Sequence, residues 1–167
     1  GYHVGMAYKT LRKESLPGSH NYSHFGLPEG SCHFSERTME AEDMRAKGEA
    51  IFAAVRKDFE ACVSKAAELD RPFFFMSGPH NTHRPWVRGF GKAYWGIDPD
   101  YLQGKLPAYM PDVPEIREDM ADYLGECQVT DRYLQEYLAV LEMKGLLENT
   151  LIIATGDNGI PGFPRGT

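Results

Sequence analysis

Two long amphipathic stretches that alternate with short apolar runs constrain the fold of this chain more than any other feature of its sequence. Apolar side chains recur every three or four residues at 38–69 and 113–144, which predicts two helices with one buried face each. Short runs rich in aromatic or β-branched residues at 2–8, 73–77 and 150–155 are typical of strands. Parallel strands need long crossover connections, so this order predicts an α/β fold with a mainly parallel sheet flanked by helices.

The length and the two ends of the chain bear on its domain organisation. The 167 residues, 42% of them apolar, suffice for a core, and the irregular segments 13–35 and 87–113 are predicted to be long loops. The first residues contain no initiating Met or leader pattern, and the chain stops ten residues after Asp157. We therefore expect residues 1–167 to be the central part of a larger domain.

Charge and cysteine content exclude several classes of protein. The net charge of -6 argues against a nucleic-acid partner, and no apolar run approaches the roughly 20 residues of a membrane span. Cys32, Cys62 and Cys127 form no Cys-x-x-Cys pair, so the sequence indicates neither a zinc site nor a redox site. Cys62 and Cys127 are expected to be buried thiols.

Asp157 and Asn158 follow the apolar run at 150–155, at the predicted end of a strand. Their side-chain oxygens are hard donors of the kind that Ca²⁺ or Mg²⁺ prefers. Two adjacent donors fall short of the roughly six to eight oxygens that Ca²⁺ takes, and an Asx turn after the strand is the alternative interpretation.

Lys9, His80 and His83 follow the other two predicted strands. If the three strands are parallel neighbours, these side chains meet Asp157 and Asn158 at one edge of the sheet, where α/β proteins bind ligands. A cation, imidazoles and oxygen ligands together suit a tetrahedral oxyanion bound to a divalent ion. Taken singly, Lys9 can be a surface lysine, and the two histidines can be a hydrogen-bonded loop pair.

Four segments resemble, in order, motifs of the sulfatase family. They are GYHVGMAYK at 1–9, PFFFMSGPHNTHRP at 72–85, the stretch 106–123, and LLENTLIIATGDNGIP at 146–161. The continuation Ile-Pro-x-Phe-Pro after residue 159 is most similar to the subgroup that contains the sulfamidases. The resemblance implies an alkaline-phosphatase-like α/β fold, here incomplete, and hydrolysis of a sulfate ester or sulfamate.

The resemblance also implies roles for single residues. Asp157 and Asn158 would be metal ligands, for Ca²⁺ or alternatively Mg²⁺, and Lys9 would contact the sulfate. His83 would bind the sulfate or protonate the leaving group, with His80 behind it. In this family the nucleophile is a formylglycine made from Cys or Ser.

The chain departs from the family pattern at several positions. The segment around Cys32 lacks the Pro and Arg of the nucleophile motif, so we expect the formylglycine and an acidic metal-binding pair to lie upstream of this chain. Tyr8 replaces a glycine before Lys9, and Leu11 replaces a histidine after it. Arg165 is a candidate substrate-binding cation, displaced by an inserted Gly162.

The sequence thus predicts a sulfuric ester or sulfamate hydrolase, acting on sulfated carbohydrate, of which these residues alone are inactive. The alternatives are a phosphate or phosphonate ester hydrolase of the same superfamily and a non-catalytic domain that binds anionic sugar. By resemblance the protein is periplasmic, secreted or lysosomal. Its oligomeric state cannot be deduced from the sequence.

Overall fold

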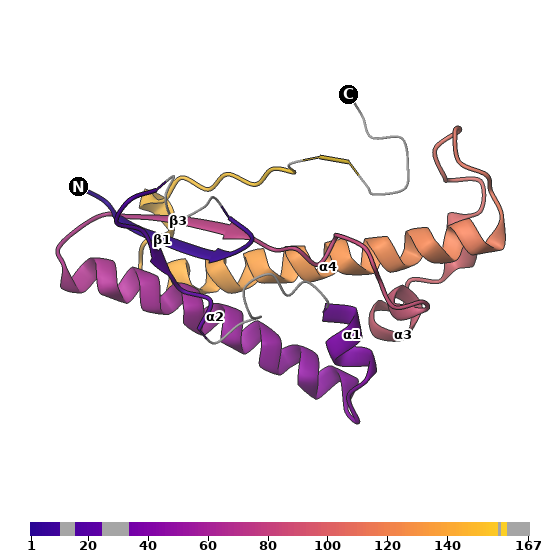
Figure 1. The fold of residues 1–167 in the computed structure, drawn as a ribbon, viewed down its shortest axis with the longest axis horizontal. Coiled ribbons are helices and arrows are strands. Elements are labelled where there is room, and N and C mark those ends of the chain that lie inside the picture. The colour runs from indigo at the N-terminus through magenta and orange to yellow at the C-terminus, as the bar shows by residue number, and fades with distance from the viewer. Residues whose placement is uncertain (11–15, 25–33, 157, 160–167) are drawn as a thin grey trace.

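A computed structural model of the chain describes residues 1–10, 16–24, 34–156 and 158–159. The regular elements, in chain order, are β1 (His3–Tyr8), β2 (His20–Asn21), α1 (Phe34–Met39), α2 (Met44–Glu68), β3 (Phe73–Gly78), α3 (Phe90–Trp95), the 3₁₀ turn Pro99–Leu102, α4 (Pro114–Met143) and the 3₁₀ turn Leu147–Asn149 (Figure 1). None of the helices in the described part of the chain is long and apolar enough to cross a membrane.

The strands form a parallel sheet in the order β2-β1-β3. β1 and β3 run in register over their whole length, from the pair His3 and Phe73 to the pair Tyr8 and Gly78. The predicted parallel sheet is confirmed, and the two longer strands end side by side. The third strand is β2 instead of the predicted strand at 150–155.

Helices α2 and α4 pack together against one face of the sheet (Figure 1). Phe59 of α2 lies between Phe75 of β3 and Tyr137 of α4, with ring centroids 4.8 Å and 5.1 Å away. Phe74 points to the opposite face and is 46% exposed, because successive side chains of a strand alternate between faces. β3 therefore packs one face against the helices and leaves Phe74 exposed on the other.

The two long helices match their predictions except at their starts. The first helix was predicted from residue 38, but α2 begins at Met44, because Asp43 accepts a hydrogen bond from the Ala46 amide at 2.9 Å and so caps the helix there. The short helix α1 lies mostly before the predicted stretch. α4 has Val113 at its N-cap without a side-chain cap, and the preceding Asp112 accepts from Arg117 and from the Gly104 amide.

The predicted strand at 150–155 is absent from the structure. Residues 151–156 are irregular and exposed, and Leu151 reaches 87% exposure. A strand is stable only when its backbone groups pair with a neighbour, and no strand in the described part of the chain pairs with this segment. The prediction that residues 87–113 form an irregular loop is also partly wrong, because this segment contains α3 and a 3₁₀ turn.

Candidate functional site

The ends of β1 and β3 bring Lys9 and the segment 79–86 together. The Lys9 amide donates to the Gly78 carbonyl at 3.0 Å. A Cβ atom on Gly78 would lie 1.5 Å from the Lys9 carbonyl oxygen, so only glycine allows the two backbones to approach this closely. The side chain of Lys9 is exposed at the rim of the sheet. The strand ends that carry Lys9 and lead into the histidine segment therefore lie side by side, whereas the strand predicted at 150–155, which was to bring Asp157 and Asn158 to this edge, is not formed.

Tyr8 turns the chain outward just before Lys9. Its φ of 65° lies in the left-handed region, which glycine adopts readily and tyrosine rarely. Its ring is buried, its amide donates to Ser23 Oγ at 2.8 Å, and its hydroxyl donates to Asp58 Oδ2 at 3.2 Å. Burial raises the pKa of Tyr8, so the hydroxyl keeps its proton and remains a donor to Asp58.

His80 and His83 lie at the two ends of one tight turn. The His83 amide donates to the His80 carbonyl at 3.0 Å, and the ring centroids are 4.7 Å apart. Nδ1 of His83 is 2.6 Å from the Arg84 carbonyl oxygen, which can only accept, so Nδ1 carries a hydrogen. The exposed His83 ring therefore has Nε2 as the nitrogen that can meet a ligand.

Arg84 fixes the far side of this loop to α4. Its guanidinium makes two hydrogen bonds to the Asp119 carboxylate, at 2.8 Å and 2.5 Å, and stacks on the Trp86 ring at 4.1 Å. The Trp86 ring in turn lies 5.4 Å from that of Tyr123 on α4. These contacts hold the loop against α4.

Two buried residues of this region were not predicted from the sequence, one in the loop itself and one in α4, on which the loop packs. Asn81 is buried between the two histidines and contacts α4, and Glu126 of α4 is completely buried. Burial raises the pKa of Glu126 to about 7, and its Oε1 accepts from the Ser35 amide at 3.3 Å. The signal in the sequence was weak, because a carboxylate on a long helix normally indicates its exposed face.

The proposed metal ligands are only partly within the described residues. Asn158 is exposed in an irregular segment, and Asp157 and the candidate cation Arg165 lie outside the described residues. Across the described ranges, no group of three or more His, Cys, Asp or Glu side chains is arranged to hold a metal ion. The oxygen donors of Asp157 and Asn158 suit a hard divalent ion in kind, and further ligands are needed to complete a site.

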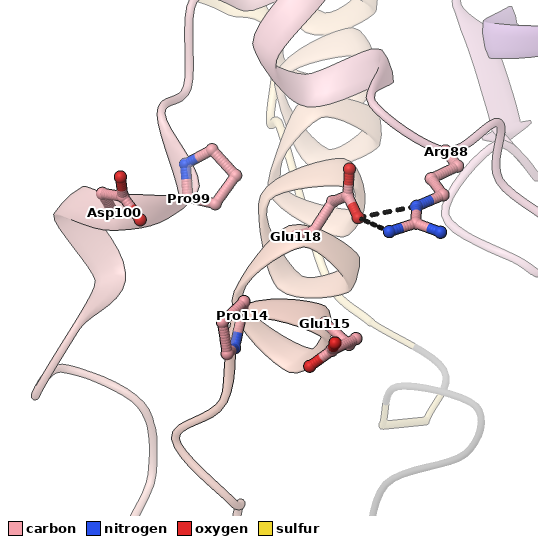
Figure 2. Close-up of a pocket in the computed structure, with 6 residues that line it drawn as sticks. All are labelled: Arg88, Pro99, Asp100, Pro114, Glu115 and Glu118. Carbon is pink, nitrogen blue, oxygen red and sulfur yellow. Dashed lines mark hydrogen bonds and ion pairs between the residues drawn. The ribbon is translucent and has the colours of Figure 1, made fainter.

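A small cavity of about 220 Å³ lies next to this region, between α4 and the segments that carry Arg88 and Asp100 (Figure 2). Arg88 is paired with Glu118 through contacts of 2.6 Å and 2.7 Å, and Glu115 and Asp100 also line the cavity. Three carboxylates against one guanidinium disfavour a sulfate group here. We do not assign this cavity to substrate.

A larger hollow of about 640 Å³ lies at the opposite end of β1, lined by His3, His20, Tyr22 and part of α2. Nε2 of His3 is 2.6 Å from the Tyr22 hydroxyl, and the His3 and His20 rings stack at 5.0 Å. Burial, followed by the neighbouring His20, lowers the pKa of His3. This hollow is separated from Lys9 by the length of β1.

Ligands of parallel α/β sheets bind at the carboxyl ends of the strands, and here two adjoining strand ends lead into a lysine and a histidine pair. The family model described as Sulfatase matches residues 1–166, and the chain belongs to the sulfatase family. The fold is accordingly that of an incomplete alkaline-phosphatase-like domain.

Similarity to a curated relative agrees with the sulfamidase-like subgroup. The chain is 32% identical over 115 residues to human N-sulphoglucosamine sulphohydrolase, an alignment that covers 58% of this chain and 23% of the relative. The chain thus spans about a quarter of that protein's length. No solved structure matches the chain.

Proposed function

We propose that the full-length protein hydrolyses a sulfuric ester or sulfamate, and that residues 1–167 are the central part of its catalytic domain. The observation that supports it is the pairing of the ends of β1 and β3, which lead directly into Lys9 and into the segment with the His80–His83 turn, in a chain of the sulfatase family. These residues supply only part of a site, so we expect them to be inactive on their own.

Each predicted site residue has a chemical task in this proposal. The Lys9 ammonium holds a sulfate oxygen, where a fixed positive charge stabilises the negative charge that develops in the transition state. His83 presents Nε2 to the substrate and either binds a sulfate oxygen or donates a proton to the leaving group. His80 supports the His83 ring from 4.7 Å away, and Arg165 is a second candidate cation for the substrate.

Asp157 and Asn158 would contribute oxygen ligands to a Ca²⁺ ion, or to Mg²⁺, together with ligands from outside this chain. When bound, such an ion neutralises charge on the sulfate group. The formylglycine nucleophile of the family would likewise come from outside these residues, because the segment around Cys32 lacks its motif.

The substrate class in this proposal is a sulfated carbohydrate. The name of the human relative specifies N-sulphoglucosamine, and its alignment with this chain makes an N-sulfated or O-sulfated sugar the first substrate to test. Sulfatase relatives also lead us to propose a periplasmic, secreted or lysosomal location.

The test measures sulfate release by the full-length protein from an aryl sulfate and from N-sulphoglucosamine. Asp157→Ala and His83→Ala should each lower kcat by roughly 100-fold or more, since each removes charge stabilisation or proton transfer at the sulfate. His20→Ala is a matched control, because His20 is an exposed histidine on β2 that belongs to the hollow at the amino-terminal end of β1.

Full activity in Asp157→Ala, or turnover by residues 1–167 alone, would contradict the proposal. Release of phosphate from a phosphate monoester without release of sulfate would support the phosphate-hydrolase alternative. Binding of sulfated sugar without any turnover would support the non-catalytic alternative.

A further inference from the structure

Asn81 is buried in the middle of a loop that also contains exposed residues. Its side chain is 1% exposed, whereas His83 and Pro85 face solvent. Nδ2 donates to the Glu126 carbonyl of α4 at 2.6 Å and to Thr130 Oγ1 at 3.3 Å. A residue of this loop is thus tied by its side chain to the backbone of a 30-residue helix.

The position of Asn81 within the turn makes this contact consequential for both histidines. The hydrogen bond from the His83 amide to the His80 carbonyl closes a four-residue turn, and Asn81 is its second residue. Fixing Asn81 therefore fixes the turn that sets the separation of the two rings. Without that contact, the turn would be held only at its ends.

The same face of α4 holds both ends of the segment. Tyr137 hydroxyl lies 2.6 Å from Ser77 Oγ near the end of β3, and Asp119 binds Arg84 beyond the turn. Asp119, Glu126, Thr130 and Tyr137 are separated by four or seven residues, so they line one side of the helix. The contact of Asn81 with Glu126 and Thr130 lies between the Ser77–Tyr137 contact and the Arg84–Asp119 contact along this side of the helix.

The buried side-chain amide of Asn81 lowers the stability of the fold through its unpaired oxygen. Its Oδ1 is buried and has no hydrogen-bond partner among the described residues. A buried acceptor without a partner costs roughly 1–3 kcal/mol, which an apolar side chain of similar size would avoid. The benefit of asparagine at this position is the donor that Nδ2 directs to Glu126 and Thr130.

We propose that Asn81 is a positioning residue, which holds the His80–His83 turn on α4 so that His83 Nε2 meets the sulfate group. This inference rests on the proposed function, because it assigns Asn81 an effect on turnover that acts through His83. Misplacement of a catalytic group by about 1 Å can cost about 100-fold in rate, so the effect should be large compared with the loss of one hydrogen bond.

The test is a double-mutant cycle for sulfate release by the full-length protein. We expect Asn81→Ala to lower kcat by about 10- to 100-fold with KM changed by less than about threefold, because Lys9 still binds substrate. In the His83→Ala background, Asn81→Ala should cause no further loss, since the group that it positions is already gone. Thr82→Ala, in the adjacent half-buried residue, is the control and should retain wild-type kcat.

Asn81→Leu serves as a second variant if Asn81→Ala does not fold, because it keeps roughly the side chain's size and removes both the donor and the unpaired buried acceptor. Losses that multiply in the double variant would overturn the inference and leave the proposed function intact. Wild-type kcat in Asn81→Ala would do the same. Wild-type kcat in His83→Ala would contradict the proposed role of His83, and the inference would fall with it.

Discussion

At the scale of single residues, Tyr8 shows how packing can hold a side chain in a backbone conformation that disfavours it. A left-handed φ costs roughly 1–2 kcal/mol for a residue with a Cβ atom. The buried ring and the hydrogen bond to Asp58 offset this cost. The result is a strand that ends at Tyr8 in a left-handed conformation and is followed by the exposed Lys9 at the rim of the sheet.

Replacement of Tyr8 by two small residues separates these effects. Tyr8→Ala should destabilise the protein by about 4 kcal/mol and Tyr8→Gly by about 3 kcal/mol, because each empties a buried aromatic site. The glycine variant should be the more stable of the two by about 1 kcal/mol, since glycine accepts φ of 65° without strain. Urea unfolding of the full-length protein measures both differences. An alanine variant as stable as the glycine variant would show that the backbone at this residue is not left-handed.

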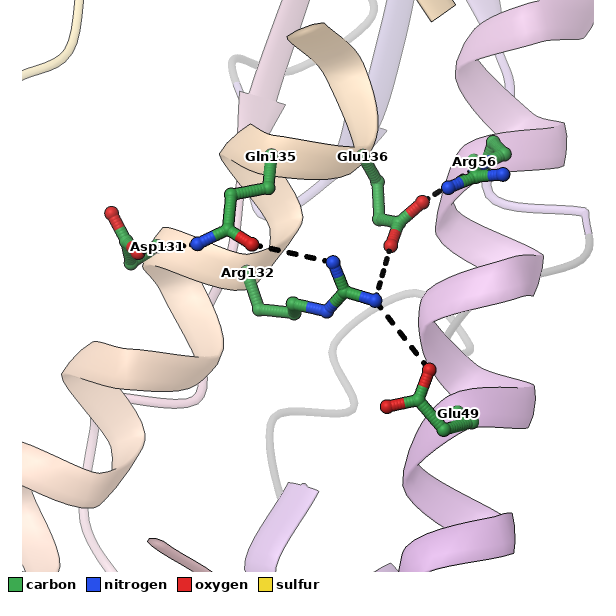
Figure 3. A network of polar contacts seen from close by, with 6 residues as sticks. All are labelled: Glu49, Arg56, Asp131, Arg132, Gln135 and Glu136. Carbon is green, nitrogen blue, oxygen red and sulfur yellow. Dashed lines mark hydrogen bonds and ion pairs between the residues drawn. The ribbon is translucent and has the colours of Figure 1, made fainter. Parts of the chain in front are cut away.

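At the scale of elements, a charged network joins α2 to α4 at the base of the sheet (Figure 3). Glu136 of α4 is buried and accepts from Arg56 of α2 at 2.5 Å and from Arg132 at 3.0 Å. Arg132 also reaches the exposed Glu49 at 3.5 Å. A buried carboxylate shared by two guanidinium groups fixes the relative positions of the helices, including the face of α4 that carries the histidine loop.

Glu136→Ala should therefore destabilise the protein by about 2 kcal/mol. Removal of one partner of a fully buried pair costs roughly 3–5 kcal/mol, and the half-exposed side chain of Arg56 reduces that figure. Glu49→Ala is the matched control and should cost less than about 0.5 kcal/mol, because Glu49 is exposed. Equal losses in the two variants, measured by urea unfolding, would show that the network does not depend on the buried carboxylate.

At the scale of the whole molecule, Glu126 lies where three parts of the fold meet. Its carboxylate accepts from Ser35 at the start of α1, and its backbone carbonyl accepts from Asn81 of the histidine loop. Burial raises the pKa of this carboxyl to about 7. The folded protein therefore holds a proton on Glu126 at pH values where the unfolded chain has released it.

This proton makes folding stability depend on pH in a defined direction. The ordinary pKa of a glutamate is 4.5, so between pH 4.5 and about 7 the folded state binds more protons than the unfolded state. The free energy of unfolding therefore falls as the pH rises from 4.5 to about 7. The full effect is of the order of 3 kcal/mol. Glu126→Gln, which cannot titrate and can still accept from Ser35, should lose less stability than the wild type between pH 5 and pH 8.

Urea unfolding at pH 5, 6.5 and 8 tests this prediction. Asp131→Asn, an exposed acid on the same helix, should follow the wild-type pH dependence and serves as the control. Parallel curves for Glu126→Gln and the wild type would mean that Glu126 titrates normally in the folded protein.

Local sequence patterns predicted β1, β3, α2 and α4, because helical and strand periodicities depend on near neighbours along the chain. They also predicted that these two strands are parallel, since crossover connections make successive strands parallel and align the carboxyl ends that precede Lys9 and the histidine segment. The roles of these residues, and of Asp157, Asn158 and Arg165, stay predictions.

Only the tertiary structure showed which predicted strands pair in the sheet and which helix holds the histidine loop. The run at 150–155 has the composition of a strand and lacks a strand partner among the described residues, and strand pairing depends on distant parts of the chain. The anchoring of Asn81 to Glu126, 45 residues away, likewise arises where the histidine loop packs on α4. A contact of this kind leaves no periodic signal in the sequence, because packing of separate elements creates it.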